Sequence, residues 1–238
     1  MSNAATILRD LQAVADERGR RAAEPALAAR VDAVKRYQHR RFARSYADLL
    51  ADARYADAAR YFLDDLYGPQ DYSERDAQFA RIVPALARLF PPALLGTIAD
   101  LTALHALAER FDTAMGRALD SDELSPSAYL RAWQAGGGRA QRDRQIDLML
   151  AVGRALDGYT RNPVLRHSLK LMRGPARAAG LGALQQLLER GFDTFAGLRG
   201  AEPFLDVIAR RERALAERLF EADDAQPSSP DDPLVQLP

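Results

Sequence analysis

The apolar residues of this sequence recur every three or four positions along most of its length, and this spacing is what most constrains the fold. Side chains at this interval share one face of an α-helix, whereas a half-buried β-strand requires strict alternation. Alanine and leucine are abundant and β-branched residues are scarce, which also favours helices. We therefore expect an all-α fold, a bundle of about eight to ten helices with no sheet.

The apolar stripes, together with residues that begin or end helices, predict where most of the helices lie. A Gly-Pro pair at positions 68–69 ends one helix, because glycine takes the left-handed conformation and proline cannot continue the helix. Ser73, followed three positions later by Asp76, is typical of a helix N-terminus. The expected helices cover residues 27–50, 55–66, 73–89, 91–119, 146–159, 163–174, 181–191 and 204–219, with a short helix around Trp133.

The chain is expected to form a single helical domain over residues 1–222, with a helix over residues 1–20 only loosely attached. The glycine run at 136–138 is the clearest interruption. Residues 1–135 carry 18 basic and 19 acidic side chains and residues 139–238 carry 15 and 14, so the two halves do not differ in charge. The glycines are therefore interpreted as a loop of the bundle. Residues 223–238 hold four prolines and four aspartates with little to bury, which predicts a disordered acidic tail.

Composition disfavours several classes of protein. Thirty-three basic and thirty-three acidic residues cancel, so no strong overall field attracts nucleic acid or an anionic membrane. The absence of cysteine excludes disulfides, thiolate catalysis and zinc fingers. No apolar run approaches the roughly 18 to 20 residues of a membrane span, and no secretory signal is recognisable. Arginine supplies 31 of the 33 basic residues, which is typical of a GC-rich genome. We expect a bacterial, cytoplasmic protein.

Residues 60–76, RYFLDDLYGPQDYSERD, resemble the signature of an uncharacterised family of bacterial, mainly proteobacterial, helical proteins, in which FFLxxLYGxxD is followed by RD. Residues 172–195 and 210–220 resemble further parts of the same family, so the likeness covers most of the chain after about residue 27. Tyr61 stands where the family usually has phenylalanine. The resemblance implies an all-helical fold and implies no reaction.

Polar residues gather at the corner between the helices expected at 55–66 and 73–89. Its candidate binding residues are Tyr67, Asp71, Arg75, Asp76 and Arg81. The amides at the start of the second helix attract anions and the arginines add positive charge, which is typical of a site for a polar ligand. The alternative is structural: the carboxylates and Ser73 cap the helix, and the arginines pair with them or with neighbouring aspartates.

A basic face is expected on the helix at 27–50. Arg36, Arg40 and Arg44 lie four positions apart and share one side of that helix, a geometry that could follow a phosphate backbone. The chain carries equal acid elsewhere, so pairing within the protein or with a second subunit is a sufficient explanation.

His105 flanks the apolar stripe of its helix and has Glu109 one turn further on, with Asp112 beyond. A histidine beside a carboxylate can act as a general base or as half of a metal site, and it can equally be satisfied by a neighbour. The Glu-x-x-His pairs of di-iron bundles, nucleotide-binding loops and nucleophile elbows are all absent from the sequence. A haem held by a single histidine is an open alternative, and the expectation is no metal and no cofactor.

Two functions remain open from the sequence. The first is a non-catalytic binding or scaffold protein that uses helix faces to form a homodimer or to bind a protein partner. The second is an enzyme or sensor that binds a small molecule at the Tyr67–Arg81 corner, with His105 contributing. Neither reading involves a membrane, and neither favours nucleic acid.

Overall fold

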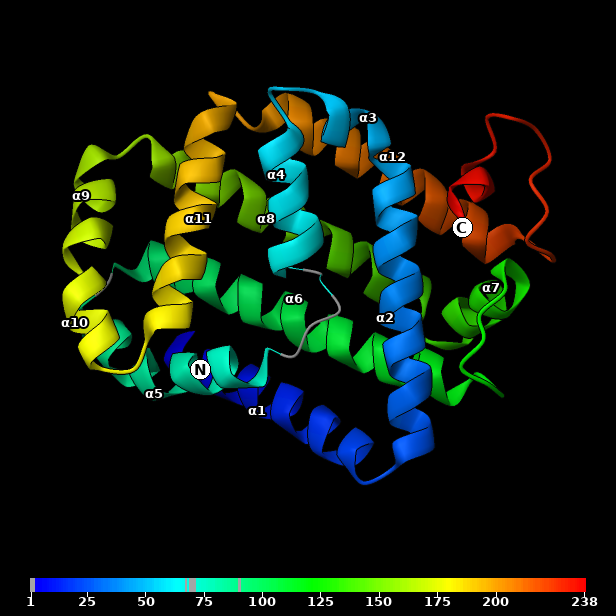
Figure 1. Cartoon of the computed structure of the whole chain (residues 1–238), viewed down its shortest axis with the longest axis horizontal. Coiled ribbons are helices and arrows are strands. Elements are labelled where there is room, and N and C mark those ends of the chain that lie inside the picture. The colour runs from blue at the N-terminus through cyan, green and yellow to red at the C-terminus, as the bar shows by residue number, and fades with distance from the viewer. Residues whose placement is uncertain (1–2, 67, 69–71, 90) are drawn as a thin grey trace.

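The computed structural model of the chain consists of α-helices joined by short connections (Figure 1). It describes residues 3–66, 68, 72–89 and 91–238. Within these ranges the chain forms twelve α-helices and no β-strand, so the expected all-α class is confirmed. Three of the helices have only five or six residues, and the other nine fall within the expected eight to ten.

The helix boundaries agree with the apolar stripes along most of the chain. In order the elements are α1 (Asn3–Ala22), α2 (Pro25–Ser45), α3 (Ala47–Ala51), α4 (Ala56–Arg60), the π-helix η1 (Tyr61–Leu66), α5 (Ser73–Leu89), α6 (Pro92–Arg117), α7 (Pro126–Ala135), α8 (Arg139–Thr160), α9 (Pro163–Leu171), α10 (Arg173–Ala178), α11 (Gly182–Leu198), α12 (Glu202–Glu221) and the 3-10 helix η2 (Pro233–Gln236). The helix expected over 27–50 is divided, because α2 ends at Ser45 and α3 begins at Ala47.

Helix α6 runs through the middle of the molecule (Figure 1). It packs against α1 and α2, which precede it, and against α7 and α8, which follow. Its buried residues Leu104, Phe111 and Met115 are at most 6% exposed. Because both earlier and later helices cover it, α6 organises the whole bundle.

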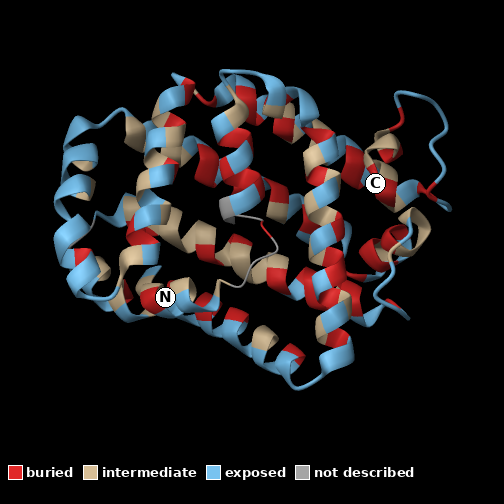
Figure 2. Cartoon of the chain, in the orientation of Figure 1, coloured by how far each residue is buried: buried red, intermediate tan, exposed pale blue. Residues whose placement is uncertain are grey.

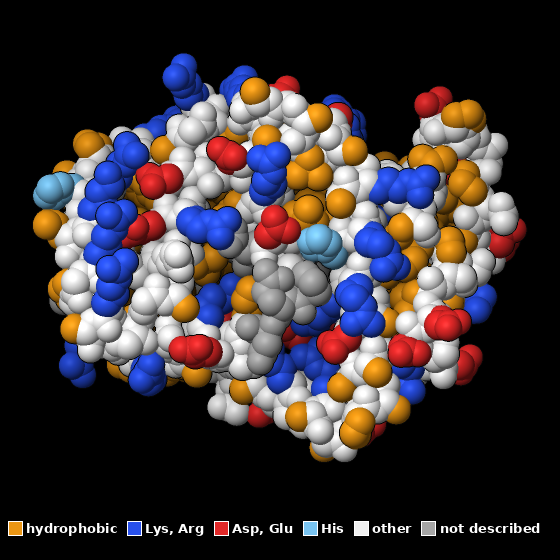
Figure 3. Space-filling view, in the orientation of Figure 1, with side chains coloured by type: hydrophobic (Ala, Val, Ile, Leu, Met, Phe, Trp, Pro, Cys, Tyr) orange, Lys and Arg blue, Asp and Glu red, His pale blue; other side chains and the backbone are white. Residues whose placement is uncertain are grey.

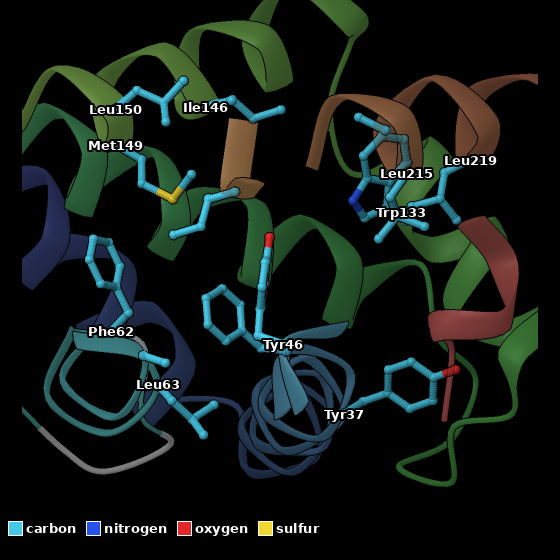
Figure 4. Close-up of a cluster of buried hydrophobic side chains, with 14 of the residues drawn as sticks. Tyr37, Tyr46, Phe62, Leu63, Trp133, Ile146, Met149, Leu150, Leu215 and Leu219 are labelled. Atoms are coloured by element: carbon cyan, nitrogen blue, oxygen red, sulfur yellow. The ribbon is translucent and has the colours of Figure 1, made fainter. Parts of the chain in front are cut away.

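The main hydrophobic core joins α2, η1, α7, α8, α11 and α12 (Figures 2 and 4). Tyr37 of α2 stacks on Tyr129 of α7 with 4.5 Å between ring centroids. In η1 three consecutive side chains, Tyr61, Phe62 and Leu63, are all buried. The wider turn of a π-helix changes the direction of successive side chains, which an ordinary amphipathic stripe does not predict.

The expectation of a loosely attached N-terminal helix is wrong. Helix α1 packs along α6 and also contacts α5. Ile7 and Val14 are each 1% exposed, and Arg18 and Arg21 form ion pairs with α6. An apolar stripe and charged partners together hold α1 in place.

Residues 223–238 also differ from the expected disordered tail. They fold back against α2 and α12, and they include η2. Leu234 and Leu237 are buried, while Arg44 of α2 donates to the Leu237 carbonyl oxygen at 3.0 Å. The two leucines, together with the ion pair between Asp232 and Arg218, hold this segment against the bundle, although they form no periodic pattern in the sequence.

Candidate functional site

The structure brings three of the predicted site residues together. Asp76 on α5 lies with its Oδ2 atom 2.7 Å from Nε2 of His105 on α6, and Nε of Arg75 donates to Oδ1 of Asp76 at 3.3 Å. Arg81 is exposed further along α5 and takes no part in these contacts. Tyr67 and Asp71 lie outside the described residues.

Arg18 on α1 connects this group to a second, deeper one. Its guanidinium donates to Oδ2 of Asp76 at 2.9 Å and to Oε1 of Glu109 at 3.1 Å, and it lies 3.3 Å from Nε2 of His105. Three helices that are distant in sequence therefore contribute to one network. We call the set Arg18, Arg21, Lys35, Arg75, Asp76, His105, Glu109 and Asp112 the charged cluster.

Glu109 is the most buried carboxylate of the charged cluster, with its side chain 3% exposed. Besides Arg18 it accepts hydrogen bonds from Arg21 and from Nζ of Lys35, the latter at 2.9 Å. Arg21 is itself buried, and its Nη1 atom has no partner among the described residues. One carboxylate is thus shared by cations from α1 and α2.

These contacts set the ionisation of the two paired carboxyls. Burial raises the pKa of Asp76, but the hydrogen bond from His105 and the charges of His105, Arg75 and Arg18 outweigh it, so the pKa lies below its usual value. Burial likewise raises the pKa of Glu109, and the charges of Lys35, Arg21 and Arg18 lower it far more. Both groups are carboxylates at neutral pH.

The pKa values of Asp112 and Arg142 are shifted so that the charged form of each group is disfavoured, unlike those of Asp76 and Glu109. Burial raises the pKa of Asp112 above its usual value; Lys35, 3.7 Å away, only partly offsets this, and the charge of Glu109 adds to the rise. Burial lowers the pKa of Arg142 to about 10. The Arg142 guanidinium lies over the rings of Phe111 and Trp133, at 4.1 and 4.5 Å from their centroids, which compensates part of its lost hydration.

The charged cluster contains more cations than anions. Four fixed cations face three carboxylates, one of which has a raised pKa. Arg18, Lys35 and His105 keep 17 to 19% of their side chains exposed, so the outer part of the cluster is accessible to solvent. Figure 3 shows Lys and Arg side chains in a hollow between α1 and α2, beside the part of the chain drawn in grey.

The capping explanation for Asp76 is only partly realised. Its two carboxylate oxygens accept from Arg75, Arg18 and His105, and the pairing with Arg75 agrees with the structural alternative. The partners on α1 and α6 belong to tertiary structure. Arg18, the residue that links the two groups, is absent from the sequence-based prediction, because a basic residue near the end of a helix carries no signal of its distant partners.

The predicted basic face is exposed and its members have different contacts. Arg36, Arg40 and Arg44 all lie on the outside of α2. The Arg40 guanidinium lies 5.6 Å from the centroid of the Tyr37 ring, and Arg44 binds the C-terminal segment. Two of the three cations, Arg40 and Arg44, therefore have contacts within the protein.

Other features of the described residues lie away from this cluster. Among them no group of three or more histidine or carboxylate side chains is arranged to hold a metal ion. Two surface pockets, of about 170 and about 460 Å³, border Arg199 at the end of α11 and include none of the predicted site residues. No helix in the described ranges has the length and apolar character needed to cross a bilayer.

A family model described as a domain of unknown function, DUF8198, matches residues 17–226. The match covers most of the chain, so the protein belongs to this family. No curated protein and no solved structure matches the chain. The family match begins just before Arg18 and includes every residue of the charged cluster.

Proposed function

We propose that this protein binds a small anionic molecule, one that carries a carboxylate or a phosphate, at the outer part of the charged cluster. The observation that carries the proposal is the convergence of Arg18, Arg75 and His105 around Asp76, from three separate helices. An arginine side chain can donate two parallel hydrogen bonds to a carboxylate or phosphate, and the cation excess favours a negative ligand.

His105 gives the proposed site an imidazole ring that is paired with a carboxylate. Its contacts with Arg18 and Asp76 both involve Nε2. Because the Asp76 carboxylate can only accept, Nε2 donates to it, and Nδ1 is then the acceptor of the neutral ring. Such a pair suits a histidine that recognises a bound ligand, and it equally suits a general base.

The test is binding of inorganic phosphate and of succinate to the full chain, measured by isothermal titration calorimetry. Arg75→Gln should weaken binding at least about tenfold, because a hydrogen bond to a charged group contributes about 1.5–3 kcal/mol. Arg81→Gln is the matched control on the same helix and should leave the affinity unchanged. Equal affinities in the two variants, or no binding of either probe, would contradict the proposal.

The finer expectations from the sequence remain proposals beside this one. We propose that residues 60–76 are a signature of the family, that its members are bacterial, and that this protein is cytoplasmic. If residues 60–76 are the signature, it overlaps the charged cluster, because its last two residues, Arg75 and Asp76, belong to both.

A further inference from the structure

Two segments at opposite ends of the molecule carry opposite charge, although the net charge of the chain is zero. Residues 161–177 contain five basic side chains and no acidic one: Arg161, Arg166, Lys170, Arg173 and Arg177. Residues 221–232 contain five acidic side chains and no basic one: Glu221, Asp223, Asp224, Asp231 and Asp232. We call these segments the basic end and the acidic end. They lie at opposite extremes of the long axis (Figure 1).

The basic end also exposes apolar side chains. Val164, Leu171 and Met172 are 68, 65 and 51% exposed. The spacing of seven positions places Val164 and Leu171 on one side of α9, and Met172 follows as its C-cap residue. Helix α9 has no buried residue, and Figure 2 shows α9 and α10 as mainly exposed ribbon. An apolar stripe bordered by cations is a typical protein-binding surface.

Part of the positive charge of the basic end is left over after internal pairing. Arg161 binds Asp157 on α8, while Arg166 binds Asp193 and Arg173 binds Glu189, both on α11. Lys170 and Arg177 are exposed, and Arg177 interacts with Glu189 only through its charge, without a direct ion pair among the described residues. Figure 3 shows a column of Lys and Arg side chains along the left side of the molecule, with Asp and Glu side chains next to it.

The acidic end offers the complementary surface. Glu221, Asp223, Asp224 and Asp231 are exposed, whereas Asp232 is buried and binds Arg218. Pro227 and Pro230 are also exposed there and provide rigid apolar surface between the carboxylates.

We propose that copies of this chain associate head to tail, with the basic end of one copy against the acidic end of the next. A two-fold dimer through either end would place like charges together, which opposes it. A second copy is favoured over an unrelated acidic protein or an anionic membrane, because the complementary acidic surface is present on the same molecule. Each joint leaves two ends free, so the assembly grows beyond a dimer.

The experiment is sedimentation velocity of the full chain over a range of concentrations, at low and at high ionic strength. We expect species larger than a dimer at low salt, and at least about tenfold weaker association at high salt, because exposed charges are screened. A strict monomer at low salt, or a dimer that does not grow, overturns the proposal. Binding to phosphatidylserine vesicles without self-association overturns it in favour of a membrane.

Two variants make the test specific. The double substitution Lys170→Gln with Leu171→Ser disables the basic end, and Asp223→Asn with Asp224→Asn disables the acidic end. All four side chains are exposed, so both proteins should fold normally, as circular dichroism checks. Each variant alone should be monomeric, and a mixture of the two should stop at a one-to-one dimer. Failure of the mixture to pair contradicts the head-to-tail geometry. Arg36→Gln, which lies outside both ends, is the control and should assemble like the original chain.

Discussion

Glu109 on α6 accepts a hydrogen bond from the guanidinium of Arg21 on α1, and both side chains are almost completely buried. The two residues are 88 positions apart in the sequence. This pair and its neighbours attach the first helix to the centre of the bundle by electrostatics as well as by apolar packing. Removing this ion pair therefore tests how strongly α1 is attached to the rest of the bundle.

Glu109→Gln should lower the free energy of unfolding by about 3–5 kcal/mol, because it leaves the buried charge of Arg21 without a partner. Asp112→Asn is the matched control one turn further along α6. It removes a buried carboxylate whose ionised form is unfavourable, so it should cost much less. Urea denaturation at neutral pH measures both; equal losses would contradict the roles assigned to the two carboxyls.

Stability should decline in acid. The pKa values of Asp76 and Glu109 are lower in the folded protein than their usual values of 3.8 and 4.5. Their contribution is complete above the usual values and is lost as the pH falls through the lowered ones. Thermal denaturation between about pH 7 and pH 2 should therefore show a falling midpoint, and Glu109→Gln should flatten the decline.

Asp112 should make stability depend on pH in the opposite direction. Its folded pKa is raised, so its contribution is present below its usual value of 3.8 and is lost as the pH rises through the folded value. The free energy of unfolding of Asp112→Asn, relative to that of the original chain, should therefore be highest at neutral pH and lowest in acid. A constant difference between the two proteins across this pH range would be evidence against the assignment.

The glycine run at 136–138 provides a packing test. A Cβ atom at Gly137 would lie 2.5 Å from Cε1 of the buried Phe111, whereas one at Gly138 meets nothing within 4 Å. Gly137→Ala should destabilise the protein by about 1–3 kcal/mol through overpacking. Gly138→Ser introduces a larger side chain at the first turn of α8, where serine is a favourable cap, and should cost nothing. Chemical denaturation of the two variants distinguishes these outcomes.

The C-terminal segment should contribute measurably to stability. Leu234 is 1% exposed, and Leu234→Ala should cost about 2–5 kcal/mol, as for other buried leucines. Pro230→Ala in the exposed part of the same segment should stay within about 0.5 kcal/mol of the original chain. If both variants were neutral, the segment would not be packed as the structure describes it.

The secondary structure was largely predictable because apolar periodicity is a local property. Helix α5 begins and ends at the positions that Ser73 and the stripe to Leu89 predict. The division at Tyr46 and the π-helix η1 were not predictable, because both depend on how those residues enter the core. The order in residues 223–238 was missed for a related reason: Leu234 and Leu237 are buried by α2 and α12, which are distant in sequence.

The candidate site was predictable only in part. Asp76 and His105 were recognised separately, and nothing in their spacing of 29 positions indicates that they meet. Arg18 carries no such signal, because its partners Asp76 and Glu109 are 58 and 91 positions away. The opposite charges of the basic end and the acidic end do not show in the charge counts of residues 1–135 and 139–238, because each end is a short segment within a long, nearly neutral half.

Helix α6 packs against α1 and α2, which precede it in the sequence, and against α8, which follows it. Helix α8 begins only after the glycine run at 136–138. During synthesis on the ribosome, the earlier helices can cover their part as soon as α6 emerges. The surface that binds α8 stays open until residues 139–160 have been translated. A chain that stops at the glycines would therefore expose a strip of core to chaperones and proteases.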